Sequence, residues 1–137
     1  MIVGRAGYYD DGDIDALEHG RWRAQVASTI RGRSGQAFLR ELVAALDALP
    51  EKRLIANELE MDGNVCAIGS VGLQRGIEMS KLDPEDPWAI AGAFGITHQL
   101  VREIEFMNDE SGWNQTPEQR WTSMRAWAVS QIKGDKP

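Results

Sequence analysis

The stretch that most constrains the fold is residues 36–50, QAFLRELVAALDALP. Its apolar residues recur at the three- and four-residue spacing of one helix face, and a proline ends the segment. This face comprises Phe38, Leu39, Leu42, Val43, Leu46 and Leu49. So wide an apolar stripe must be covered by other elements before the helix is stable in water. We therefore expect this helix to form the centre of a helical core.

A second helix is expected to precede it, from about residue 13. Trp22, Val26 and Ile30 recur every four residues, which places them on one helix face. Two glycines follow within the sequence RGRSG, and Ser34 between them is a suitable cap for the helix over 36–50.

Three further helix starts carry capping signals. Asp83 with Pro84 in the first turn predicts a helix that runs to Phe94, and Thr97 predicts a cap for a helix to about residue 108. Thr116 is followed by a proline and then by Gln119, the spacing of a capping box. We expect this last helix to bury a stripe of Trp121, Met124, Ala128 and Ile132.

Residues 51–80 allow either a short hairpin or two short helices. Asp62-Gly63 is a strong turn signal, whereas three glycines are spaced as close-packing points on a helix. These glycines are Gly69, Gly72 and Gly76. We favour a short helix over about 65–75 that follows a short extended piece.

The expected architecture is mainly α: one compact bundle of five to six helices over residues 13–133, with a short β-hairpin near 53–68. Residues 1–12 are expected to form a flexible N-terminal arm and 134–137 a C-terminal tail. The chain of 137 residues contains no apolar run of membrane-spanning length and no signal peptide pattern, so we expect a cytoplasmic protein without membrane contact. The single Cys66 lies in an apolar run, which predicts a buried thiol.

The formal net charge of −6 is unevenly distributed. Residues 1–18 carry −4, residues 19–53 carry +4 and residues 54–137 carry −6. An acidic total disfavours nonspecific DNA binding, which depends on neutralising phosphates, although a local basic face can still supply that contact.

Residues 89–104, AIAGAFGITHQLVREI, have the spacing of a helix-turn-helix. That motif needs a glycine in the turn and apolar residues that lock its two helices together. The positions are filled by Ile90, Ala91, Phe94, Gly95, Ile96, Val101 and Ile104. The segment therefore resembles the helix-turn-helix family over about twenty residues, although any closely packed helical hairpin uses the same residue types.

The second helix of this pair carries the candidate recognition residues. With Val101 and Ile104 facing inward, a rotation of about 100° per residue turns another set outward. This set comprises Gln99, Arg102, Glu103, Phe106 and Glu110. Gln99 and Arg102 can pair with base edges, and Thr97 or His98 can reach a phosphate. Against DNA, residues 97–110 have a net charge of −3, and Phe106 suits a protein partner better.

A second candidate site is an arginine cluster at the two ends of the helix expected over residues 13–31. Arg21, Arg23, Arg31 and Arg33 can hold phosphate or an acidic protein. The alternative is a solvated face whose arginines pair with the acidic N-terminal segment or with neighbouring helices.

No catalytic or metal-binding constellation is found in the sequence. His19 and His98 are 79 residues apart, and the acidic run at Asp10, Asp11, Asp13 and Asp15 lacks the remaining EF-hand positions. We expect a binding protein without a cofactor, a metal or an enzymatic activity.

Most of residues 20–132 resembles a family of uncharacterised small proteins from bacteriophages and prophages. The stretches that carry the likeness are RWRAQVASTIRGRSGQAFLRELVAALDALPEKRLIA, GNVCAIGSVGLQRG, FGITHQLVREIEFMNDE and TPEQRWTSMRAW. The resemblance implies a phage-related context and carries over no catalytic residue. The function expected first is a DNA-associated module that acts through the helix-turn-helix-like segment, with a homodimer as one option. The alternative is a protein that inhibits or modulates a host system through Phe106, Trp113 and acidic surface, with the helix-turn-helix-like pair purely structural.

Overall fold

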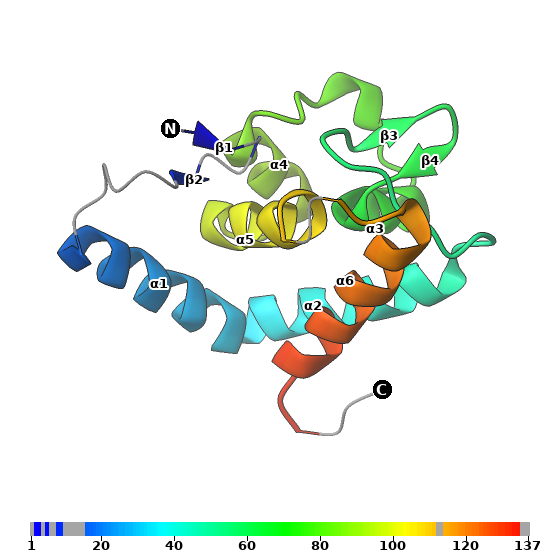
Figure 1. Cartoon of the computed structure of the whole chain (residues 1–137). Helices are drawn as coiled ribbons and strands as arrows, with labels where there is room; N and C mark the ends of the chain where they lie inside the picture. Colours follow the sequence, from blue (N-terminus) through cyan, green and yellow to red (C-terminus); the bar gives the residue numbers. More distant parts are fainter. Residues whose placement is uncertain (1, 4, 6–7, 10–15, 112–113, 135–137) are drawn as a thin grey trace.

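The computed structural model describes residues 2–3, 5, 8–9, 16–111 and 114–134. Within them the chain is mainly helical, as expected (Figure 1). The helices are α1 (Ala16–Arg31), α2 (Arg33–Ala48), α3 (Ala67–Arg75), α4 (Pro87–Phe94), α5 (His98–Asp109) and α6 (Pro117–Gln131), with one 3-10 turn, η1 (Met79–Lys81). In this part of the chain no helix is both long and apolar enough to cross a membrane.

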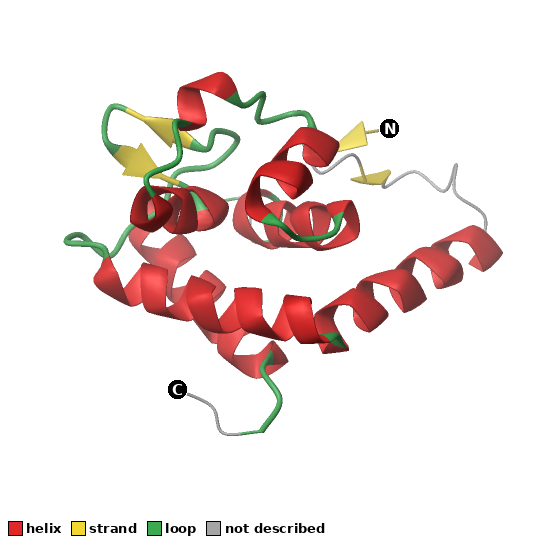
Figure 2. Cartoon of the chain, turned by 180° about the vertical axis from the view of Figure 1, so that it is seen from behind, coloured by secondary structure: helices red, strands yellow, loops and turns green. Residues whose placement is uncertain are grey.

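Helices α1 and α2 lie end to end along one side of the molecule, away from α4 and the hairpin at residues 60–65 (Figures 1 and 2). Gly32 joins them and caps α2, so the prediction of Ser34 as the cap is wrong. The two helices meet so closely that a Cβ on Gly35 would lie 1.9 Å from the carbonyl oxygen of Thr29. The apolar stripe of α2 is buried along its whole length, as predicted.

Helix α5 occupies the middle of the bundle. It contacts α1, α3, α4 and α6, while α2 packs against α3 and α6 below it. The buried stripe of α6 contains Met124, Ala128 and Ile132, as predicted, and the half-buried Trp121 donates its indole N–H to the carbonyl of Leu46 at 3.0 Å.

A short hairpin precedes α3, in agreement with the sequence. Strand β3 (Glu60–Met61) pairs antiparallel with β4 (Asn64–Val65). Asp62 and Gly63 both have positive φ angles, the conformation of a type I′ hairpin turn. The buried Cys66 then caps α3, because its sulfur accepts the Gly69 N–H at 3.3 Å.

The predicted helix caps have mixed outcomes. Thr97 caps α5, and Thr116 with Gln119 forms the complete capping box of α6, both as predicted. The prediction that Asp83 and Pro84 begin a helix is wrong, because α4 is capped by Asp86. Asp83 instead accepts the Glu85 N–H at 2.9 Å and closes a turn before the helix.

The N-terminal segment contributes a second small hairpin. Strand β1 (Ile2–Val3) pairs antiparallel with β2 (Tyr8–Tyr9). Arg5, between the two strands, is only 6% exposed. At these described positions the N-terminal segment thus forms a hairpin, while the flexible arm expected over residues 1–12 stays a prediction. The acidic positions 10, 11, 13 and 15, together with Trp113 and tail residues 135–137, lie outside the described residues.

Candidate functional site

The α4–α5 pair has the apolar contacts that its sequence predicts. Ile90 and Phe94 of α4 are buried, as are Val101 and Ile104 of α5. Gly95 has a φ of +72° and provides the turn between the helices. The segment therefore folds as the tightly packed helical hairpin expected for residues 89–104.

The predicted recognition face of α5 is largely covered. Glu103 was expected to face outward but is 4% exposed, because α1 lies against this side of α5. Its carboxylate accepts two hydrogen bonds from the Arg23 guanidinium, at 2.8 and 3.0 Å. Gln99, Arg102 and Phe106 are half-buried. A helix enclosed in this way presents few side chains to a DNA groove.

An aromatic stack connects the start of α5 with α4 and α1. The His98 ring stacks on Trp88 with 3.7 Å between ring centroids, and it lies 6.1 Å from the Trp22 ring. The Arg102 guanidinium lies 5.5 Å from the centroid of the Trp22 ring. Burial, together with the charge of Arg102, lowers the pKa of His98. Trp88 itself remains 63% exposed at the outer end of the stack.

Thr97, predicted as a phosphate contact, is already occupied by local hydrogen bonds. Its hydroxyl accepts the Leu100 N–H at 3.1 Å and lies 2.6 Å from the hydroxyl of Thr29 on α1. These bonds anchor the start of α5 to α1.

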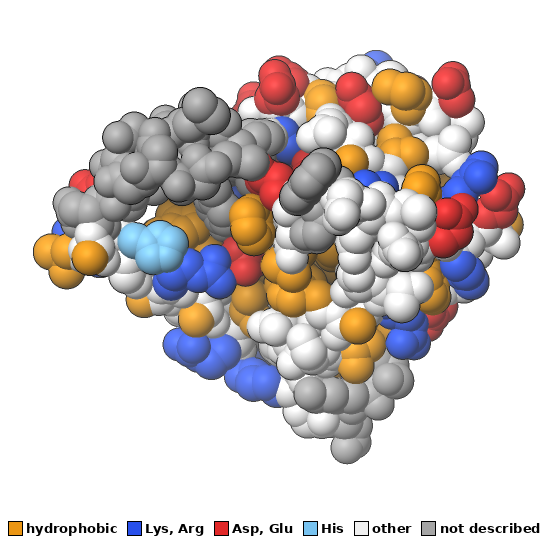
Figure 3. All heavy atoms as spheres, viewed as in Figure 1, with side chains coloured by type: hydrophobic (Ala, Val, Ile, Leu, Met, Phe, Trp, Pro, Cys, Tyr) orange, Lys and Arg blue, Asp and Glu red, His pale blue; other side chains and the backbone are white. Residues whose placement is uncertain are grey.

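The arginine cluster divides into two groups. Arg23 pairs with Glu103, whereas Arg21, Arg31 and Arg33 are exposed and form no ion pair with any described residue. Figure 3 shows Lys and Arg side chains gathered over α1 and the start of α2. Among these four arginines and the described residues, only Arg23 therefore forms the ion pair with a neighbouring helix that the structural alternative predicts.

A buried charged cluster lies at the other end of α5. Arg5 donates to both carboxylate oxygens of Asp109, at 2.6 Å from Nε and 3.2 Å from Nη2. Its Nη1 lies 3.4 Å from Glu105, whose side chain is fully buried. Neither Glu105 oxygen has a hydrogen-bond partner among the described residues.

Asp109 and its neighbour Asn108 tie this cluster to the rest of the fold. Oδ1 of Asp109 also accepts the backbone N–H of Asn57 at 3.1 Å and the side-chain amide of Asn108 at 2.7 Å. The Asn108 amide in turn donates to the carbonyl of Ile55 and accepts the N–H of Ala67. The end of α5 thereby holds the N-terminal hairpin, the loop near residue 57 and the start of α3.

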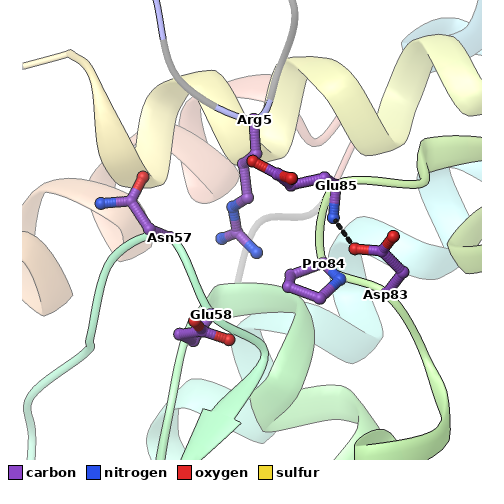
Figure 4. A pocket seen from close by; sticks show the side chains of 6 residues that line it. All are labelled: Arg5, Asn57, Glu58, Asp83, Pro84 and Glu85. Carbon is purple, nitrogen blue, oxygen red and sulfur yellow. Dashed lines mark hydrogen bonds between the residues drawn. The ribbon is translucent and has the colours of Figure 1, made fainter.

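A polar cavity of about 530 Å³ opens beside Arg5 (Figure 4). It is lined by Arg5, Asn57, Glu58, Asp83, Pro84 and Glu85. In the described part of the chain, no three His, Cys, Asp or Glu side chains are grouped to hold a metal ion. Carboxylates therefore border the cavity without forming a cation cage.

Sequence reasoning missed this cluster because acidic residues are expected at the surface. One signal was present: Glu105 and Asp109 are four residues apart and therefore share one face of the helix. Arg5 is also the lone basic residue among the first 18.

Burial of Glu105 has a consequence for the pH dependence of stability. Burial is the main cause that raises its pKa from 4.5 to about 8. The negative charges of Asp109 and Glu110 also raise this pKa, whereas the positive charges of Arg5 and Arg102 lower it. Between these two pH values the folded protein holds a proton that the unfolded chain has released, so stability falls as the pH rises.

We predict that the free energy of unfolding falls by about 1.4 kcal/mol between about pH 7 and about pH 9 because Glu105 loses its proton. Glu105→Gln, which cannot ionise, should remove this slope. Urea unfolding at several pH values measures it for both proteins. Equal slopes in the two proteins would show that Glu105 ionises normally in the fold.

No protein-family model matches the chain, and neither a curated protein nor a solved structure matches it.

Proposed function

We propose that this chain is a non-enzymatic protein-binding module whose contact surface is centred on Trp88. The observation that carries the proposal is the exposure of 63% of this large aromatic residue while its ring is stacked on His98. Tryptophan is among the residues most enriched at the energetic centres of protein interfaces.

The stack prepares Trp88 for binding. His98 is held between Trp88 and Trp22, and Trp22 is in turn covered by Arg102. A side chain ordered before association loses less rotamer entropy when a partner covers it. The same stack leaves the outer face of the indole as the available contact area.

The charge near Trp88 indicates the chemistry of the partner. Asp83, Glu85 and Asp86 directly precede α4, and all three are exposed. A complementary surface would combine an apolar pocket for the indole with basic side chains at its rim. In the phage-related context that the sequence suggests, such a partner would be a host protein.

Association with duplex DNA is the second candidate, and it rests on a different observation. Arg21, Arg31 and Arg33 are exposed and have no ion-pair partner among the described residues, so they are free to contact phosphates. Other helices enclose α5, so this proposal is limited to contacts between α1 and α2 and the phosphate backbone of DNA. It does not include contacts between α5 and base edges.

The substitution Trp88→Ala tests the first proposal, with Leu73→Ala as the matched control. Leu73 is also an exposed apolar residue, at 48%, but it lies on α3. Partners captured from a host lysate are purified, and the dissociation constant is measured for each variant. We expect Trp88→Ala to weaken binding by roughly 30-fold, the loss typical of a hot-spot residue, and Leu73→Ala to have little effect.

Equal affinities for the two variants would refute the assignment of Trp88. Titration against duplex DNA at low and physiological salt tests the second candidate. Salt-sensitive DNA binding that survives Trp88→Ala but is lost in a combined Arg31→Gln and Arg33→Gln variant would favour it.

A further inference from the structure

We propose that Asp109 and Glu105 form an arginine-binding pocket, which Arg5 fills from within the chain and which accepts an arginine of a partner peptide when Arg5 leaves. The pocket lies in the last turns of α5, whereas the Trp88 stack lies at the opposite end of the same helix. The inference does not rest on the function proposed above, although Asp83 and Glu85 border both regions.

The donor and acceptor geometry is specific for a guanidinium group. Asp109 accepts from both Nε and Nη2 of Arg5, an arrangement that the single ammonium of lysine cannot reproduce. The third nitrogen, Nη1, lies 3.4 Å from Glu105 and makes no hydrogen bond to any described residue. Among the described residues, both Glu105 oxygens therefore remain as unused acceptors beside the guanidinium site.

The surroundings of the pocket favour an incoming cation. Figure 4 shows the Arg5 side chain extending into the space bordered by Asn57, Glu58 and Pro84. Two more acidic residues, Asp83 and Glu85, line the same cavity of about 530 Å³. Three carboxylates thus border an opening large enough for an extended peptide side chain, with Arg5 as the one cation among the lining residues.

Arg5 lies between two very short strands. Strands β1 and β2 contain two residues each, and such a short hairpin has little stability of its own. Within residues 16–111 and 114–134, the buried apolar side chains form one core that extends from Val26 to Ile132. The helices thus have an apolar core of their own, and the proposal requires that this core persists when Arg5 leaves.

Chemical rescue of Arg5→Ala tests the pocket. The variant removes the guanidinium and leaves Asp109 and Glu105 in place, so ethylguanidinium at about 10 mM should bind and raise its melting temperature in a saturable manner. Ethylammonium at equal concentration is the matched control for charge. We expect little effect of either cation on the unmodified protein, in which Arg5 occupies the pocket.

A second variant tests the assignment of the acceptor. In the double variant Arg5→Ala/Asp109→Asn, the gain with ethylguanidinium should be lost. A short blocked peptide containing one arginine should stabilise Arg5→Ala, whereas the same peptide with lysine should not.

Three results would overturn the proposal: no stabilisation of Arg5→Ala by ethylguanidinium, an equal effect of ethylammonium, or the same gain in the double variant. If Arg5→Ala does not fold alone, recovery of its fold by ethylguanidinium is the supporting result. If Arg5→Ala stays unfolded, Arg5→Lys is used instead. Ethylguanidinium should displace the poorly fitting lysine and raise the melting temperature of this variant. The absence of that rise would refute the pocket.

Discussion

Asp109→Ala is expected to lower the free energy of unfolding by about 3–5 kcal/mol, the cost of removing one partner from a buried ion pair. The side chains of Arg5 and Asp109 are each only 2% exposed. Without the carboxylate, Arg5 retains Glu105 as its nearest acidic neighbour, and the Asn57 N–H loses its acceptor. The protein interior cannot solvate these groups as water does, which makes the loss large.

An exposed pair with almost the same geometry provides the control. Asp47 accepts two hydrogen bonds from Arg125, at 2.6 and 3.0 Å, but its side chain is 44% exposed. Asp47→Ala should cost at most about 1 kcal/mol, because water replaces the lost contacts. Urea unfolding of both variants gives the comparison. Similar losses in the two would contradict the view that burial determines the cost.

The helices could be predicted from the sequence because their signals are local. Thr97 and Thr116 cap the helices that follow them, and the stripe of α2 needs only its own spacing to be recognised. The turn at Asp62-Gly63 is similarly fixed by two neighbouring residues. The start of α4 was misplaced because both Asp83 and Asp86 precede a proline, and the local pattern does not distinguish them.

The charged contacts could not be predicted because they join distant parts of the chain. Arg5 and Asp109 are separated by 104 residues, and Arg23 and Glu103 by 80. Spacing within α5 identifies an apolar side at Val101 and Ile104 but does not reveal that other helices cover its remaining faces. The outward orientation assigned to Glu103 followed from treating α5 as a surface helix.

Gly69→Ala is expected to destabilise the protein by about 3 kcal/mol or more, through steric overlap. A Cβ at Gly69 would lie 2.0 Å from the carbonyl oxygen of Leu59 and 3.0 Å from the Cβ of Val65. The obstacle at Leu59 is backbone, and that carbonyl also accepts the Cys66 N–H at 3.1 Å. The hairpin and α3 would have to separate, with loss of packing and of this hydrogen bond.

Gly92→Ala provides a control in which the same atom is added without a clash. Gly92 lies in α4, and apart from its chain neighbours and the nearby backbone of its own helix, no heavy atom lies within 4 Å of its added Cβ. Alanine should be neutral there or stabilise the helix by up to about 1 kcal/mol, because it loses less backbone entropy than glycine on folding. Urea unfolding should therefore give changes of opposite sign. A mild effect at Gly69 would mean that α3 and the β3–β4 hairpin can move apart at little cost, and the close approach would then not hold the fold together.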